Sequence, residues 1–295
     1  MPDVKAYFEN VVETESAFTL HICLDYFNRR LRVDDYRGDV DAICKRAADI
    51  ASSHAFTKIF VKSREEDWPD FLSRGYMLEG IYKAYFNGRD AFCMALYFDL
   101  NRRTSDYWME EDDILRQVLE MPPKPEQSTA LPQNFTLRAA ALEDAERLAV
   151  LYRHVFPRYP TPMDDAAYIE KVIGDGTIFY VSEHENSLVS AASAEINRVY
   201  RNAEITDCAT LAEFRRHGMM RLLIRALEDD LRSRGIHCAY SLSRALSFGM
   251  NASLFQLGYR YCGRLTKNCD IYDKFEDMNL WVKVLPGSVP STDGG

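Results

Sequence analysis

The 295-residue chain lacks the features that mark membrane proteins, disulfide-bonded scaffolds and metal sites. No apolar run approaches the ~20 residues that a membrane-spanning helix needs, and residues 1–5 do not begin a signal peptide. The seven cysteines form no C-x-x-C pair, and an odd, scattered set is typical of reduced thiols. The six histidines show no H-x-x-x-H spacing, so the sequence predicts no metal site. Together these absences indicate a cytoplasmic protein.

Positive charge is also in short supply. The net charge of −9 argues against nucleic acid and anionic membranes as partners, and it suits a small cationic substrate. Apolar residues make up 47% of the chain, which is ample for burial, and the length suits two domains rather than one. Whether the protein forms a homodimer is left open, because a single sequence does not fix the oligomeric state.

The chain divides at residues 121–133, a segment with four prolines and almost no large apolar side chain. Such a composition resists both helix and sheet, and it therefore predicts a linker between domains. We assign residues 1–120 to an N-terminal domain and residues 134–285 to a C-terminal domain. Residues 286–295 have the composition of a disordered tail.

Hydrophobic periodicity in residues 134–285 predicts the element order β-α-α-β-β-β-α-β-α-β-β. The central part of this order is the most informative segment of the chain. It predicts a strand over 203–211, a basic turn over 215–220, an amphipathic helix to Arg234, a strand over 237–243 and a short helix ending near Tyr259.

The basic turn predicts a seat for a pyrophosphate. A helix start presents unpaired backbone N–H groups and the positive end of the helix dipole. Gly218 would let this backbone approach a phosphate closely, and Arg215 and Arg216 add positive charge.

This order of strand, Arg-x-x-Gly turn, helix, strand and Leu-Gly-Tyr helix end resembles the acetyl-CoA site of the GNAT N-acetyltransferases. The resemblance implies an α+β fold with a mixed α/β/α sheet, and acetyl-CoA as co-substrate. The family pairs pantetheine with the central strand and the phosphates with the turn, which implies these cofactor contacts: Cys208, Ala209, Thr210, Leu211, Arg215, Arg216, His217, Gly218, Met219, Met220, Asn251 and Phe255. Two residues depart from the family pattern. Met220 replaces a small residue of the turn, and Leu254 replaces the tyrosine that serves as general acid.

Glu204 and Asp207 are the candidate catalytic residues. An alkylammonium with a pKa near ~10.4 is neutral in only about one molecule in a few thousand at pH 7, so a base must remove its proton. The family resemblance places the catalytic glutamate at Glu204. Strand alternation would send Glu204 and Asp207 to opposite faces unless a bulge intervenes. GNAT enzymes bulge this strand, so we expect both carboxylates to approach the site.

Further segments resemble the β-lysine N-acetyltransferases: residues 155–164, 206–210, 275–283 and 86–92. That resemblance implies acetylation of the side-chain amine of β-lysine, which gives the compatible solute Nε-acetyl-β-lysine. A cleft for this substrate needs acids or amides for the second amine and a cation for the carboxylate. The candidates for substrate binding are Tyr159, Asn268, Glu276, Asp277 and Asn279, with Arg198 and Arg244 as carboxylate partners. Two alternatives stay open: another acceptor such as lysine or a polyamine, and a catalytically silent acetyl-CoA-binding protein.

Residues 39–98 contain a fainter copy of the second half, with a helix predicted over 40–53 and strands over 58–62 and 90–97. Gly75-Tyr76 is followed by Gly80 with the same spacing that separates Gly258-Tyr259 from Gly263. We interpret the segment as the back half of a smaller, degenerate GNAT-like α/β domain. It has no Arg-x-x-Gly turn, so we expect no cofactor there. An unrelated α+β domain with a chance match is the alternative.

Overall fold

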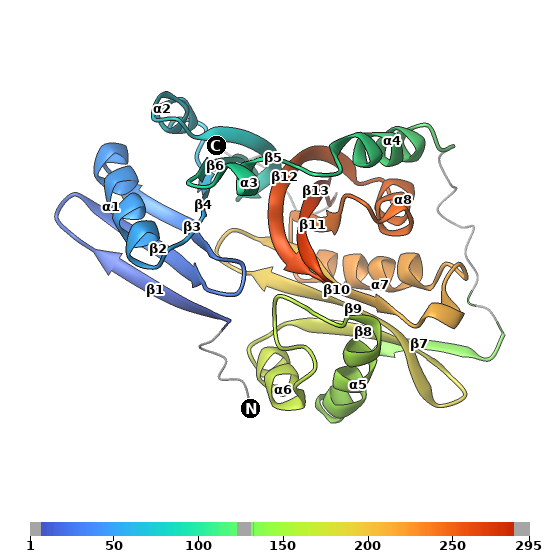
Figure 1. The fold of residues 1–295 in the computed structure, drawn as a ribbon. Helices are drawn as coiled ribbons and strands as arrows, with labels where there is room; N and C mark the ends of the chain where they lie inside the picture. The colour runs from blue at the N-terminus through green and yellow to red at the C-terminus, as the bar shows by residue number, and fades with distance from the viewer. Residues whose placement is uncertain (1–6, 123–130, 132, 286–295) are drawn as a thin grey trace, which may run out of the picture.

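The structure is a computed structural model that describes residues 7–122, 131 and 133–285. Most of the predicted linker and all of the predicted tail, residues 286–295, lie outside the described residues. The described strands form one mixed sheet in the order β1-β2-β3-β4-β6-β5-β12-β13-β11-β10-β9-β8-β7. The sheet runs through the whole molecule, and Figure 1 shows α5 and α6 on one side of the C-terminal strands and α7 on the other. The fold is therefore of the predicted mixed α+β class.

The C-terminal half confirms the predicted order of elements. Its elements are β7 (Phe135–Ala139), α5 (Ala145–Val155), α6 (Ala166–Gly174), β8 (Ile178–His184), β9 (Ser187–Asn197), β10 (Asn202–Thr210), α7 (Met219–Ser233), β11 (Cys238–Arg244), α8 (Phe248–Gln256), β12 (Arg260–Ile271) and β13 (Lys274–Val284). The apolar face of α7 lies against β8, β9 and β10, where Leu223, Leu227 and Leu231 are fully buried. This packing places the start of α7 near the C-terminal end of β10, which ends at Thr210.

The N-terminal half contains more strands than the sequence pattern predicts. Its elements are β1 (Phe8–Thr14), β2 (Phe18–Asp25), β3 (Arg30–Gly38), α1 (Val40–Ser53), β4 (Lys58–Ser63), α2 (Trp68–Ser73), β5 (Met77–Phe86), β6 (Arg89–Tyr97), α3 (Leu100–Arg103) and α4 (Trp108–Leu119). The sequence predicts α1, β4 and β6 but misses β1, β2, β3 and β5. Helix α4 packs on α8, and its Val118 joins the core beneath α7 and α8. The domain boundaries remain a prediction.

The two halves repeat one topology. The strand order β1-β2-β3-β4-β6-β5 matches β8-β9-β10-β11-β13-β12, and in both sets only the third and fourth strands are parallel. The register repeats as well. Across β3, β4 and β6 the Cα partners are Arg32, Phe60 and Ala95, and across β10, β11 and β13 they are Glu204, Tyr240 and Val282. Two residues earlier on β6, Cys93 partners Gly80 of β5. Two residues earlier on β13, Leu280 partners Gly263 of β12. Arg32 thus occupies the position equivalent to Glu204, and Gly80 the position equivalent to Gly263.

The halves join edge to edge through β5 and β12, where Gly263 is the Cα partner of Gly80. The backbones approach so closely that a Cβ on Gly263 would lie 2.2 Å from the Glu79 carbonyl oxygen and 2.4 Å from the Cα of Gly80. Gly263 also has a φ of +140°, which side chains rarely tolerate. Two facing glycines therefore make a continuous sheet across the halves sterically feasible.

Among the described residues, no helix has the length and apolar content that crossing a membrane requires.

Candidate active site

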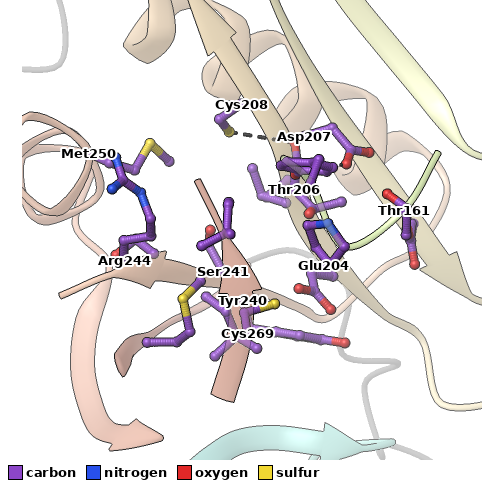
Figure 2. Close-up of a pocket in the computed structure, with 18 of the residues that line it drawn as sticks. Thr161, Glu204, Thr206, Asp207, Cys208, Tyr240, Ser241, Arg244, Met250 and Cys269 are labelled. Carbon is purple, nitrogen blue, oxygen red and sulfur yellow. Dashed lines mark hydrogen bonds between the residues drawn. The ribbon is translucent and has the colours of Figure 1, made fainter. Parts of the chain in front are cut away.

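A cavity of about 1260 Å³ opens between the two halves of the sheet. Its walls come from β3 and β4 in the first half, from β9, β10 and β11 in the second, and from the starts of α7 and α8. The volume exceeds the roughly 300–1,000 Å³ of a typical small-molecule pocket, so the cavity has room for an elongated cofactor and an acceptor together. Figure 2 shows Glu204 and Asp207 along β10, with Tyr240 on the adjacent strand.

The predicted phosphate turn forms one end of the cavity. Five of its residues line the cavity: Arg215, Arg216, Gly218, Met219 and Met220. Gly218 is the N-cap of α7 and has a left-handed conformation with φ +78°. No side chain caps the helix start there, so the first N–H groups of α7 are left for a ligand. His217 instead packs beside Phe135, with ring centroids 6.2 Å apart, and does not line the cavity.

The strand end that precedes the turn is only partly exposed to the cavity. Cys208 and Thr210 line it, whereas the Ala209 side chain is buried on the other face, and the Leu211 N–H donates to the Val189 carbonyl. Alternation along the strand explains this pattern. Ala209 and Leu211 could reach a ligand only through their backbone atoms.

Asn251 lies outside the cavity lining, contrary to the predicted cofactor contact. It is fully buried, its Nδ2 donates to the carbonyls of Arg244 and Ser247, and its Oδ1 accepts from Ser243, Asn279 and Trp281. Such a saturated amide stabilises the packing of α8 on the sheet.

Phe255 also packs inward. Its ring lies 6.4 Å from that of Trp281, and it does not line the cavity. Leu254, at the position of the family's general acid, is fully buried in the core beneath α7 and α8.

A bulge in β10 brings the two candidate bases to one cavity. The pairing of β10 with β9 shifts register between Thr206 and Ala209, and Asp207 has a left-handed φ of +48°. Because the extra residue resets the alternation, Glu204 and Asp207 both line the cavity. The predicted bulge is confirmed.

Asp207 is held rigidly and lies largely out of solvent, with 6% exposure. Its Oδ1 accepts a hydrogen bond from the Tyr159 hydroxyl at 3.0 Å, and its Oδ2 accepts one from Ser193 Oγ at 2.5 Å. Burial raises the pKa of Asp207 to about 6, although both hydrogen bonds favour the ionised form. A carboxylate with this pKa is a competent base near neutral pH.

Glu204 lies in a row of three residues across adjacent strands, with Glu195 on β9 and Tyr240 on β11 as its Cα partners. Burial raises the pKa of Glu204, and the cations Lys62 and Arg32 oppose that shift. The Glu195 side chain lines the cavity and is exposed there. Desolvation by the surrounding cavity walls, together with the charges of Glu204 and Asp207, raises the pKa of Glu195 to about 8. The sequence analysis missed Glu195, which is the one acid in the otherwise apolar and small-residue run 188–196.

The first half contributes a basic group that the sequence analysis also missed. Arg32 Nη2 and Lys62 Nζ each donate to a different oxygen of Asp34, both at 2.8 Å. Lys62 Nζ also lies 5.3 Å from the centre of the Tyr85 ring. All four residues line the cavity. The alternation of residues 31–34, apolar then charged, was the available signal.

Of the predicted substrate residues, Tyr159 and Asn268 line the cavity, and Glu276, Asp277 and Asn279 do not. These last three are buried polar groups of the β12–β13 hairpin. Their partners are, respectively, Arg244 and Lys274 at 3.5 Å, the Lys267 N–H at 2.8 Å, and Asn251 at 3.0 Å. These contacts stabilise the hairpin, and the position of the three residues outside the cavity lining does not support the predicted role in substrate binding.

Of the two arginines predicted as carboxylate partners, only Arg244 lines the cavity. Arg244 lines the cavity, but it stacks over the Tyr272 ring at 4.1 Å and pairs with Glu276. Arg198 is exposed and lies outside the lining. Neither offers a free cation deep in the site.

The cavity therefore combines a helix start suited to phosphate with carboxylates suited to deprotonating an amine. Within the described part of the chain, no group of three or more His, Cys, Asp or Glu residues is arranged to hold a metal ion.

Comparison with known proteins identifies the family to which this chain is related. Residues 142–259 match the model of the acetyltransferase (GNAT) family. The chain is 40% identical over 262 residues to the N-acetyltransferase YodP of Bacillus subtilis, covering 88% of this chain and 94% of the relative. It is 34% identical over 270 residues to a beta-lysine N(6)-acetyltransferase of Methanosarcina mazei, covering 85% of this chain and 100% of the relative. A solved ribosomal-protein-alanine N-acetyltransferase from Brucella melitensis matches 51% of this chain and 99% of its own, with a TM-score of 0.45 and 20% identity.

Proposed function

Because this chain belongs to the GNAT family of N-acetyltransferases, we propose that it transfers an acetyl group from acetyl-CoA to the side-chain amine of β-lysine. The product would be Nε-acetyl-β-lysine, a compatible solute made in the cytoplasm. The name of the Methanosarcina relative supports this acceptor. The observation that carries the proposal is the single cavity that holds both the open helix start at Gly218 and the carboxylates of Glu204 and Asp207.

The residues at the turn fit acetyl-CoA. The left-handed Gly218 exposes the first N–H groups of α7, and Arg215 and Arg216 supply charge for a pyrophosphate. The pairing of β10 with β11 ends at Glu204, which leaves the later part of β10 without a strand partner on that side for the pantetheine arm and the thioester carbonyl. When bound, acetyl-CoA supplies an activated thioester.

The carboxylates of β10 supply the proton acceptor. An ammonium that enters the cavity gives its proton to Glu204, with Asp207 as the second acceptor. The free amine then attacks the thioester carbonyl directly and forms the new C–N bond. The nitrogen gives its second proton to solvent, and the C–S bond breaks to release CoA as a thiolate. With Leu254 buried where the family has its tyrosine, solvent protonates the departing thiolate.

The test is release of CoA from acetyl-CoA mixed with β-lysine, lysine or spermidine. We expect the highest kcat/KM for β-lysine, and mass spectrometry should place the acetyl group on the side-chain nitrogen. A preference for lysine or spermidine would overturn the choice of acceptor. Absence of turnover with all three amines, in protein that binds acetyl-CoA, would identify a catalytically silent binding protein.

A further inference from the structure

The cavity between the halves has walls of opposite charge. The second half contributes the carboxylates of Glu195, Glu204 and Asp207. The first half contributes Arg32 and Lys62, and Arg32 occupies the strand position equivalent to Glu204. A repeat that places a guanidinium where its counterpart places a carboxylate creates a cavity suited to a ligand with opposite charges at its two ends.

The basic wall has more positive charge than its own carboxylate neutralises. Arg32 and Lys62 share Asp34, so two cations face one anion. Arg32 Nε is a buried donor without a hydrogen-bond partner within the described residues, while the Arg32 side chain as a whole keeps 35% exposure to the cavity. The other acids of the first half that line the cavity are engaged, because Asp25 pairs with Arg30 and Asp35 with Arg64. The remaining acids near the two cations are Glu195 and Glu204 of the second half, whose pKa values burial raises and both cations act to lower. Within the first half, one positive charge of the pair Arg32 and Lys62 is therefore left without a carboxylate of its own.

A second unpartnered atom lies beside this wall. Arg30, two residues from Arg32 on the same strand, donates from Nη1 to the backbone carbonyl of Asn268 at 2.7 Å. The side-chain Oδ1 of Asn268 is buried and accepts no hydrogen bond from any described residue, yet Asn268 lines the cavity. Asn268, which contacts β3 through Arg30, thus gives the cavity an unused acceptor that suits an amine close to a carboxylate.

Aromatic rings connect the two charged walls. Tyr82 and Tyr85 of the first half lie 4.9 and 5.7 Å from Tyr240 of the second, measured between ring centroids. Tyr240 is in turn the strand neighbour of Glu204. These rings provide an apolar surface for an alkyl chain that reaches from one wall to the other.

We propose that the first half is the acceptor-recognition half of the enzyme. Arg32, with Lys62, binds the carboxylate of an amino acid acceptor, Asn268 Oδ1 accepts from its nearby amine, and the distal amine reaches Glu204 and Asp207. The ligand class is a diamino acid whose reacting amine is separated from the carboxylate by a short alkyl chain. This inference rests on the proposed function and assigns the part of the molecule that selects the acceptor.

The test compares β-lysine with 1,4-diaminopentane, which is β-lysine without its carboxyl group. For the wild type and for Arg32→Met, the ratio of kcat/KM for β-lysine to kcat/KM for the diamine is measured. Removal of one partner of a desolvated charge pair predicts that this ratio falls on the order of 10²-fold, mainly through KM for β-lysine. Arg32→Lys keeps the charge, so its ratio should lie between the ratio of the wild type and that of Arg32→Met.

The matched control is Arg37→Met, an exposed arginine on the same strand that lies outside the cavity. Its ratio should equal that of the wild type. Acetyl-CoA affinity verifies that each variant is folded, and Lys62→Met, which keeps the Arg32–Asp34 pair, replaces Arg32→Met if the latter is unfolded.

The outcomes separate the two proposals. If the wild type acetylates β-lysine but Arg32→Met lowers both kcat/KM values by the same factor, the carboxylate site is wrong while the proposed function stands. If the wild type prefers the diamine, or acetylates neither compound, the proposed function fails and this inference fails with it.

Discussion

The two halves of the sheet begin their equivalent helices in different ways. Helix α7 begins at Gly218, which has no side chain to occupy the helix start. Helix α1 begins at Asp39, whose carboxylate accepts a hydrogen bond from the Ala42 N–H at 2.8 Å. The anion seat of the first half is therefore filled by the chain itself. One topology serves both halves, and a single N-cap residue decides whether the helix start is available to a cofactor.

The equivalent strands β3 and β10 share a bulge but differ in the charges that they carry. On β10 the extra residue lies between Thr206 and Ala209, and Asp207 of this bulge lines the cavity. On β3 the extra residue is Asp34, because His21 partners Asp35 while Ile22 partners Val33. The position of Glu204 is taken by Arg32 in the first half. This comparison indicates that core packing maintains the topology, whereas helix caps and individual charges assign the chemistry.

The largest effect is expected where the helix starts differ. Gly218→Glu places a carboxylate in the pyrophosphate seat, and an unpaired like charge there costs several kcal/mol. We expect acetyl-CoA binding to become undetectable by calorimetry, with the variant still folded by circular dichroism. Asp39→Asn, which keeps a capping side chain on α1, is the control and should bind acetyl-CoA normally. Normal affinity in folded Gly218→Glu would show that the turn has only a structural role.

The next effect concerns the equivalent positions 204 and 32. Glu204→Gln should lower kcat/KM about 10²–10⁴-fold at pH 7. Activity should recover partly at pH 9–10, where free amine becomes abundant. Arg32→Met, in contrast, should raise KM without this recovery at high pH. Rates measured from pH 5 to 10 distinguish a base from a binding cation.

The pKa of Asp207 predicts how the activity of the enzyme depends on pH. Its pKa of about 6 means that it is ionised above pH 6 and protonated below, so a base at this position loses activity as the pH falls through 6. Asp207→Asn should remove that acidic limb. If Glu204→Gln keeps wild-type rates and Asp207→Asn loses them, the two roles are reversed. If neither changes the rate, the amine arrives already neutral.

The smallest effect is expected at the junction between the halves. Gly263→Ala places a Cβ against the Glu79 carbonyl and requires an alanine at φ +140°, so overpacking and backbone strain together should cost about 2–5 kcal/mol. Gly258→Ala is the matched control. It has φ +85° with open space around the new Cβ and should cost only about 1–2 kcal/mol. Equal losses in urea unfolding would mean that the close approach of the two backbones does not matter.

The sequence predicts the C-terminal half well because its signals are local. A glycine at the start of α7, alternating strands and a periodic helix each depend on residues that are neighbours in the chain. The sequence analysis missed strands β1 to β3, although the alternation of residues 31–34 is typical of a half-buried strand. What such alternation does not reveal is whether the charged surface, here with Arg30, Arg32 and Asp34, faces solvent or a cavity. Only the partner half of the molecule turns that surface into the wall of a cavity.

A related reason explains why three of the predicted substrate residues lie outside the cavity. Glu276, Asp277 and Asn279 have the chemistry of a binding site, yet they are buried, and their partners lie on β11, on α8 and in the β12–β13 hairpin itself. A sequence does not distinguish a polar group that binds a ligand from one that is satisfied inside the fold. That distinction depends on burial and on contacts between residues far apart in the chain.

The Gly80–Gly263 pair has a consequence for assembly. Equivalent residues of equivalent antiparallel strands face each other only where a local two-fold axis passes between them. The chain thus contains, within one polypeptide, the isologous contact through which two identical subunits would form a dimer. That edge is used internally, so a second copy that added its strands to the sheet would have to pair with β1 or β7, the two outermost strands.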